Sequence, residues 1–242
     1  MPGVAQWRED LTRLDPAAWP EFLDTHSGLP GPRGNIELAM ALAELAADDL
    51  VEALIASGDE YRVFCGVVAL GPRATEPDVA ARLRILAADA RWRVREAVAI
   101  GLQRLGDNDF DGLASVVSKW AKDADPLVQR AAAAAICEPR LLRTPEAAGV
   151  AIETCRRATA DLAARPASTR REPGVRTLRQ GLGYCWSVAV AADPEPGLIA
   201  FEALDDRDPD VAWIINHNLR KARLARLVPP AKTNTGDGQR NE

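Results

Sequence analysis

The residues of this 242-residue chain that could do chemistry are few, and they are not grouped for catalysis. The two histidines, His26 and His217, lie far apart in the sequence. The four cysteines form no Cys-x-x-Cys pair and have no histidine at the spacing of a zinc site. The chain also lacks a Gly-x-Ser-x-Gly nucleophile elbow and a Gly-x-x-x-x-Gly-Lys phosphate loop. We therefore predict no catalytic residues, no metal and no cofactor.

Arginines supply a second kind of chemistry, the binding of anions. The net charge of the chain is −5, yet residues 140–180 carry nine positive and four negative groups, and residues 212–242 carry six and two. The first segment contains a loop at 165–174 rich in Pro and Arg, and long loops often carry function. We expect either an anion-binding surface that includes Arg170, Arg171 and Arg179, or a solvated surface without a ligand, which is what runs of charge usually are.

The elements that must position these residues are helices. Six apolar stripes recur along the chain, and the residues three, four and seven positions after the start of each are mostly apolar, as one face of a helix requires. The stripes begin at Ile36, Val63, Val94, Val128, Val175 and Val211, which are 27, 31, 34, 47 and 36 residues apart. A repeat of this length predicts helix pairs that bury their apolar faces by stacking on one another. We predict an all-α fold over residues 1–228, an α-α superhelix of about six antiparallel helix pairs in one domain, and a disordered tail at 229–242.

Two polar residues interrupt these stripes. Arg179 lies four positions after the start of the fifth stripe, and Asn218 lies seven positions after the start of the sixth. A polar side chain on a buried face needs a hydrogen-bond partner, or the helix must turn so that the side chain meets solvent. Because no helix pair follows the last helix, predicted at 209–224, we expect Asn218 to lie on a partly open face.

Three of the predicted second helices open in the same way. In the segments 89–97, 123–131 and 206–211, an Asp is followed by Trp or Pro three positions later and by Val five positions later. These segments resemble HEAT repeats, in which an Asp opens the second helix, a Val packs inward and an Arg one position later often ties neighbouring units together. The resemblance covers most of residues 15–224, and Arg95 stands at the Arg position of the family. It implies an adaptor whose second helices line a concave groove.

Candidate groove residues follow from this arrangement. They are Trp92, Arg95, Gln129, Arg176, Gln180 and Tyr184. Arg, Trp and Tyr are favoured at the energetic centres of interfaces because they combine large contact area with directed hydrogen bonds. Arg95 has the alternative role of a tie between repeats. The leading prediction is a non-enzymatic scaffold that binds a protein partner through the groove.

A second resemblance favours nucleic acid as the partner. In length, repeat number and Trp content the chain is distantly similar to the alkylpurine DNA glycosylases of the AlkD type. That family implies a basic concave face that holds DNA, with Trp rings beside a catalytic Asp and an Arg. Trp92, with Arg95 and Glu96 within one turn, is the best match, and Trp186 and Trp213 also lie on predicted second helices. The negative net charge disfavours nucleic acid, because phosphate neutralisation supplies most non-specific affinity for DNA. Nucleic-acid binding or repair is therefore the alternative prediction.

The sequence also predicts where the chain works. No run of about 18 apolar residues is present to span a bilayer, and the first ten residues lack the basic start and apolar core of a signal peptide. We expect no membrane partner and a cytoplasmic location.

Overall fold

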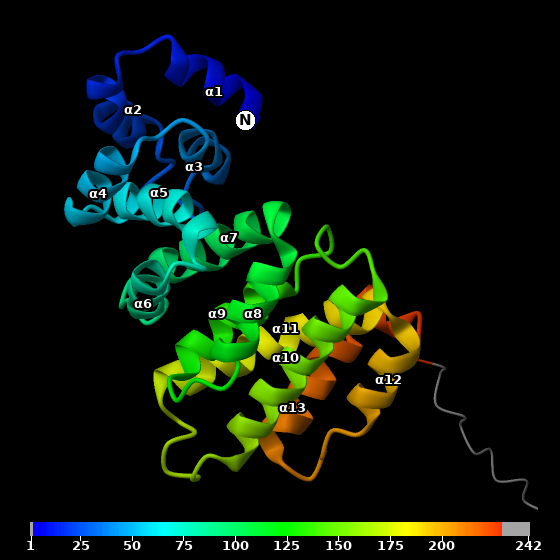
Figure 1. Ribbon diagram of the computed structural model, residues 1–242. Coiled ribbons are helices and arrows are strands. Elements are labelled where there is room, and N and C mark those ends of the chain that lie inside the picture. The colour runs from blue at the N-terminus through cyan, green and yellow to red at the C-terminus, as the bar shows by residue number, and fades with distance from the viewer. Residues whose placement is uncertain (1, 229–242) are drawn as a thin grey trace, which may run out of the picture.

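The computed structural model describes residues 2–228, which fold into helices and connecting loops without any strand (Figure 1). The all-α prediction is confirmed for these residues, and the predicted tail at 229–242 lies outside them. The α-helices are α1 (Val4–Thr12), α2 (Trp19–His26), α3 (Ile36–Ala43), α4 (Asp48–Ala56), α5 (Glu60–Leu70), α6 (Pro77–Leu86), α7 (Trp92–Asn108), α8 (Phe110–Trp120), α9 (Pro126–Ile136), α10 (Pro145–Ala164), α11 (Pro173–Ala192), α12 (Pro194–Glu202), α13 (Pro209–Leu219) and α14 (Ala222–Ala225). Two short 3₁₀ turns, η1 (Pro16–Ala18) and η2 (Gly71–Arg73), join some of them.

Helix starts follow the Asp and Pro signals of the sequence. Side-chain oxygens of Asp59, Asp125 and Asp208 accept hydrogen bonds from backbone N–H groups in the first turns of α5, α9 and α13. Those N–H groups have no partner within the helix, so the caps stabilise the helix ends. Pro126 and Pro209 follow two of these caps, at the first helical position, where a missing N–H costs nothing.

The helices that carry the six stripes pack against one another in chain order. We call α3, α5, α7, α9, α11 and α13 the second helices, and each contacts the next. The helices α4, α6, α8 and α10 each pack against the second helix that follows, whereas α12 packs against α11 and α10. Figure 1 shows α1 to α5 at one end of the molecule and α10 to α13 at the other. The buried residues form a hydrophobic cluster that extends from Trp7 to Leu224.

A pair of glycines sets the spacing between two second helices. A Cβ added to Gly71, just after α5, would lie 2.2 Å from the Cα atom of Gly101 on α7. No real Cβ approaches backbone that closely, so only glycine permits this crossing. Tight crossings of this kind let neighbouring helices bury small side chains against each other.

The C-terminal end differs from the prediction. The last stripe does not continue as one helix to residue 224, because α13 ends at Leu219 and the chain turns into the short helix α14. Helix α14 packs against both α11 and α13, with Leu224 fully buried. Asn218 therefore has 0% of its surface exposed, and the expectation of a partly open face was wrong.

Candidate binding face

A hollow lies where three second helices meet. It has a volume of about 370 Å³ and takes apolar side chains from α3 and α7, namely Ile36, Met40 and Ile100. Its polar lining includes Glu96 and Gln103 on α7, Arg130 on α9 and Arg140 in the loop after α9. Because the lining comes from α3, α7 and α9, the hollow opens on the surface that the second helices share. We call this surface the second-helix face.

Arg130 lies at the centre of this face, between α7 and α11. Its Nη1 donates a hydrogen bond to the backbone oxygen of Arg95 at 3.3 Å, and its Cγ lies 3.2 Å from where a Cβ on Gly181 of α11 would be. Burial lowers the pKa of the Arg130 guanidinium, and the Glu96 carboxylate partly offsets that effect. An arginine stays charged under such conditions, so the face carries a fixed, partly desolvated cation.

Exposed residues of α11 extend the face towards the C-terminus. Arg176, Gln180 and Tyr184, spaced four apart, are all exposed on one side of the helix. Gly181, which lies on the α9 side of this stripe, approaches Arg130, whereas Gly183, on its other side, approaches Trp213 of α13. The stripe therefore lies between α9 and α13. Tyr184 has 44% of its surface exposed, and the structure places these three predicted residues together on one helix face.

Two other predicted residues point inward. Gln129 has 1% of its surface exposed, and its Nε2 donates to Asp161 of α10 at 3.1 Å. Arg95 uses Nη1 to bind the backbone oxygens of Asp89 and Ala90, at 2.6 and 2.9 Å, in the turn before its own helix. Both side chains hold the scaffold together, so we leave them out of the binding face. Arg95 therefore has a structural role, but its side chain bonds within its own repeat and is not the predicted tie between repeats.

Two of the arginines that tie repeats together were passed over by sequence reasoning. Arg93 donates to the Glu60 carboxylate at 3.0 Å and to the Gly31 backbone oxygen at 2.8 Å, which joins α7 to two earlier repeats. Arg104 binds the backbone oxygens of Met40 and Ala43, at 3.0 and 3.3 Å, at the end of α3. Burial lowers the pKa of Arg104. Both residues lie on α7 outside the position at which HEAT repeats place their Arg.

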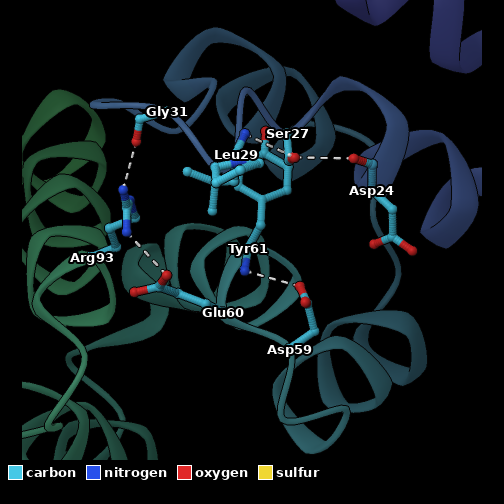
Figure 2. A pocket seen from close by; sticks show the side chains of 9 residues that line it. Asp24, Ser27, Leu29, Gly31, Asp59, Glu60, Tyr61 and Arg93 are labelled. Carbon is cyan, nitrogen blue, oxygen red and sulfur yellow. Dashed lines mark hydrogen bonds and ion pairs between the residues drawn. The ribbon is translucent and has the colours of Figure 1, made fainter.

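Arg93, which follows Trp92 in the sequence, lines a second cavity, which Figure 2 shows from close by. Trp92 has 46% of its surface exposed, and the Arg93 guanidinium carbon lies 4.6 Å from the centre of its ring. The cavity has a volume of about 560 Å³ and lies between the loop after α2 and the start of α5. Its charged groups are already engaged: Asp24 binds Arg62 at 2.8 Å, and Asp59 caps α5. The hydrogen bond from Arg62 lowers the pKa of Asp24. This cavity is a satisfied junction between repeats.

The three candidate anion-binding arginines are not equivalent. Arg170 binds Asp208 at 2.5 Å, and Arg179 binds Asp210 at 2.6 Å, so the first turn of α13 neutralises both. The guanidinium of Arg179 also lies 4.7 Å from the ring centre of Trp213. Arg171 is exposed and has no ion pair with residues 2–228. Arg179, the polar residue on the fifth stripe, therefore has its partners. Among the candidate arginines, only Arg171 has no carboxylate partner among residues 2–228.

The tryptophans of the second helices do not form one site. Trp92 is exposed at the start of α7, whereas Trp186 is fully buried and donates to the Thr159 hydroxyl at 2.9 Å. Trp213 is covered by Arg179 and by the ring of His217, whose centre lies 3.6 Å away. An arrangement with several exposed rings beside an acid and an arginine is absent among residues 2–228.

Comparisons of the chain with protein families, with curated proteins and with solved structures found no match. Within residues 2–228, no three His, Cys, Asp or Glu side chains are arranged to hold a metal ion. Over the same range, no helix has both the length and the apolar character that crossing a membrane requires.

Proposed function

We propose that this chain is a non-enzymatic α-solenoid of HEAT-like helix pairs that binds a segment of another protein across its second-helix face. The order of packing supports the solenoid, because each second helix contacts the next along the chain. The repeated valines that begin the stripes are all buried, from Val63 to Val211. Each helix pair therefore buries its apolar stripe against its neighbours. The exposed second-helix face is left to bind a partner.

The hollow between α3, α7 and α9 is the observation that carries this proposal. Its apolar part, Ile36, Met40 and Ile100, suits apolar side chains of a peptide. The polar groups beside it, Glu96 and Arg130, carry opposite charges and can fix the register of a bound segment. Mixed polar and apolar lining of this kind is typical of peptide grooves, whereas a DNA-binding surface is uniformly basic.

A peptide library selected on the full chain tests the proposal. Ala134 lines the hollow from α9, and Ala134→Glu would fill it with a charged side chain without removing a core contact. We expect selected peptides to bind the Ala134→Glu variant at least about tenfold more weakly. Ala160→Glu, at an exposed position on α10, is the matched control and should leave affinity unchanged. If no peptide is enriched, or if both variants bind equally well, the proposal is wrong.

Nucleic-acid binding remains the second candidate, and one observation favours it. Arg176, Lys221 and Arg223 have no ion pair with residues 2–228, so the C-terminal end of the face has uncompensated positive charge. Titration of a DNA duplex at two salt concentrations measures this candidate, because phosphate contacts give a steep salt dependence. We also propose a cytoplasmic location, which the four buried free thiols support.

A further inference from the structure

We infer that the C-terminal end of the second-helix face is a carboxylate-binding site, built from Tyr184, Lys221 and Arg223, which recognises an acidic segment of the partner protein. This inference rests on the proposed function, and it names the chemistry of the partner. The site combines an exposed phenol on α11 with two cations, Lys221 directly before α14 and Arg223 within it.

The geometry brings three donors together. Arg223 Nη2 donates a hydrogen bond to the Tyr184 hydroxyl oxygen at 2.9 Å, which leaves the hydroxyl proton of Tyr184 free to donate to a ligand. The Arg223 guanidinium carbon lies 5.0 Å from the centre of the Tyr184 ring, and the Lys221 ammonium lies 5.6 Å from it. Phenol, guanidinium and ammonium groups are all strong partners for a carboxylate. A carboxylate bound beside the Tyr184 hydroxyl would accept its proton in the field of the two nearby cations.

The framework holds these donors in place. Asn218, directly before the turn, is fully buried and binds the backbone of α11 at Leu182 and Ser187. Leu224, directly after Arg223, is fully buried as well. The segment that carries Lys221 and Arg223, which includes the start of α14, is therefore fixed at both ends, and this lowers the entropy lost when a ligand binds.

The charges at this site have no internal partner. Neither Lys221 nor Arg223 has a carboxylate within ion-pair distance among residues 2–228, and the same holds for Arg176 on the same face of α11. The contrast with Arg170 and Arg179 is informative, because each of those binds an aspartate of α13. Arg170 and Arg179 are therefore neutralised by α13, whereas Arg176 and Arg223 on the second-helix face have no such partner among residues 2–228. Positive charge left unpaired on a binding face favours an acidic partner.

An acidic peptide fits this face better than a nucleic acid does. Single strands bind such sites by stacking bases on aromatic rings, and the Tyr184 ring already has two cations against it. Glu96 lines the adjoining hollow and would repel the unbroken charge of a phosphate backbone along the face, whereas a peptide can place apolar residues there instead of carboxylates. A peptide with apolar residues for the hollow and carboxylates for the Tyr184 site matches both parts.

Fluorescence anisotropy with a labelled peptide tests the inference. The probe is a peptide of about twelve residues made of Glu and Leu, and the comparison probes are its Lys and Leu counterpart and a single-stranded thymidine oligonucleotide of the same length. We expect the full chain to bind the acidic peptide and to bind the basic one far more weakly. Lys221→Glu with Arg223→Glu should weaken the acidic peptide by about tenfold or more, since two attractive contacts become repulsive. Tyr184→Phe should weaken it by about tenfold, because it removes one hydrogen bond to a charged group.

The matched control separates a site from general charge attraction. Arg33→Glu with Lys122→Glu makes the same change in net charge at two exposed positions without an ion pair among residues 2–228, and it should leave the affinity unchanged. Equal losses for both double variants would overturn the inference, and so would equal binding of acidic and basic peptides. Tighter binding of the oligonucleotide, lost in the Lys221 and Arg223 variant, would assign the site to nucleic acid instead. If library peptides bind through the hollow but neither contain acidic residues nor respond to this variant, the proposed function stands and the inference fails.

Discussion

Replacement of Asn218 by alanine should destabilise the protein more than any other single change to a polar residue of α13. The Asn218 Oδ1 accepts from the Ser187 backbone N–H at 2.8 Å, and its Nδ2 donates to the Leu182 and Ile214 backbone oxygens at 2.9 and 2.8 Å. The site is completely buried, so water cannot replace these bonds. A buried polar group left without its partner costs about 1–3 kcal/mol.

The expected magnitude follows from this count. Asn218→Ala deprives one buried N–H and two buried oxygens of a partner. Because Ile214 and Leu182 lie in helices, their backbone oxygens also take part in helical hydrogen bonding, which reduces the cost. We expect a loss of about 3 kcal/mol in the free energy of unfolding. For a chain of this size, that loss lowers the melting temperature by roughly 6–12 °C. Asn216→Ala, on the exposed side of the same helix, should change stability by less than about 0.5 kcal/mol.

Urea unfolding followed by circular dichroism measures both variants, and hydrogen exchange shows whether α13 and α14 open before the rest of the chain. A loss below about 1 kcal/mol for Asn218→Ala would refute the reasoning. Equal losses for Asn216→Ala and Asn218→Ala would do the same, because they would show that the hydrogen bonds to α11 contribute nothing beyond helix propensity. The result also bears on function, since Asn218 fixes the segment that carries Lys221 and Arg223.

Three further predictions follow from close contacts, ion pairs and buried thiols. Gly71→Ala should cost about 3 kcal/mol in unfolding free energy, because its Cβ would lie 2.2 Å from the Cα atom of Gly101. Gly149→Ala, whose Cβ would meet open space near the start of α10, should instead be neutral or stabilising, and the reverse order of melting temperatures would contradict the packing. The hydrogen bond from Arg91 lowers the pKa of Asp89 below its usual 3.8, so this pair contributes stability above about pH 4 that is lost as the pH falls through the folded pKa. Asp89→Asn should therefore lose less stability than the wild type between neutral pH and pH about 3 in urea titrations, and an unchanged pH profile would count against the pair. All four cysteines are buried, and burial raises the pKa of the Cys65 thiol, so a thiol reagent should label none of them in the native chain and all four in denaturant, while fast labelling of the native chain would be inconsistent with this packing.

The sequence predicted the helices well because their signals are local. The apolar stripes, the Asp caps and the Pro residues at helix starts all depend on spacing within a few residues, and the structure has helices at each predicted stripe. Helix α1 lies before the first stripe and was missed, although Trp7 and Leu11 are buried four positions apart. The stripe pattern predicts that Arg179 needs a hydrogen-bond partner. It does not predict that this partner is Asp210, which lies 31 residues further along the chain.

The candidate site was harder to predict because side-chain direction depends on how helices cross. Trp92, Arg93 and Arg95 are close in sequence, yet their side chains go three different ways. The first is exposed, the second reaches two earlier repeats, and the third binds backbone oxygens in the turn before its own helix. Gln129 immediately follows a buried valine, and α10 covers its side chain. The sequence of α9 alone does not show that α10 is long enough to reach it. Arg176, Gln180 and Tyr184 could be assigned to one face of α11, because exposed residues on a helix recur with the same period as buried ones.

The distribution of paired and unpaired arginines is the strongest link between this fold and its proposed function. An arginine that ties repeats together needs a fixed acceptor, and Arg93, Arg170 and Arg179 each have a carboxylate within 3.0 Å. An arginine kept for a ligand must have no such acceptor before the ligand arrives, because an internal carboxylate would compete for it. Arg223 meets that condition while its guanidinium is positioned by Tyr184. Arg170 and Arg179 therefore serve the scaffold, whereas Arg223 fits the proposed partner site, and the presence or absence of an aspartate beside the arginine distinguishes the two cases.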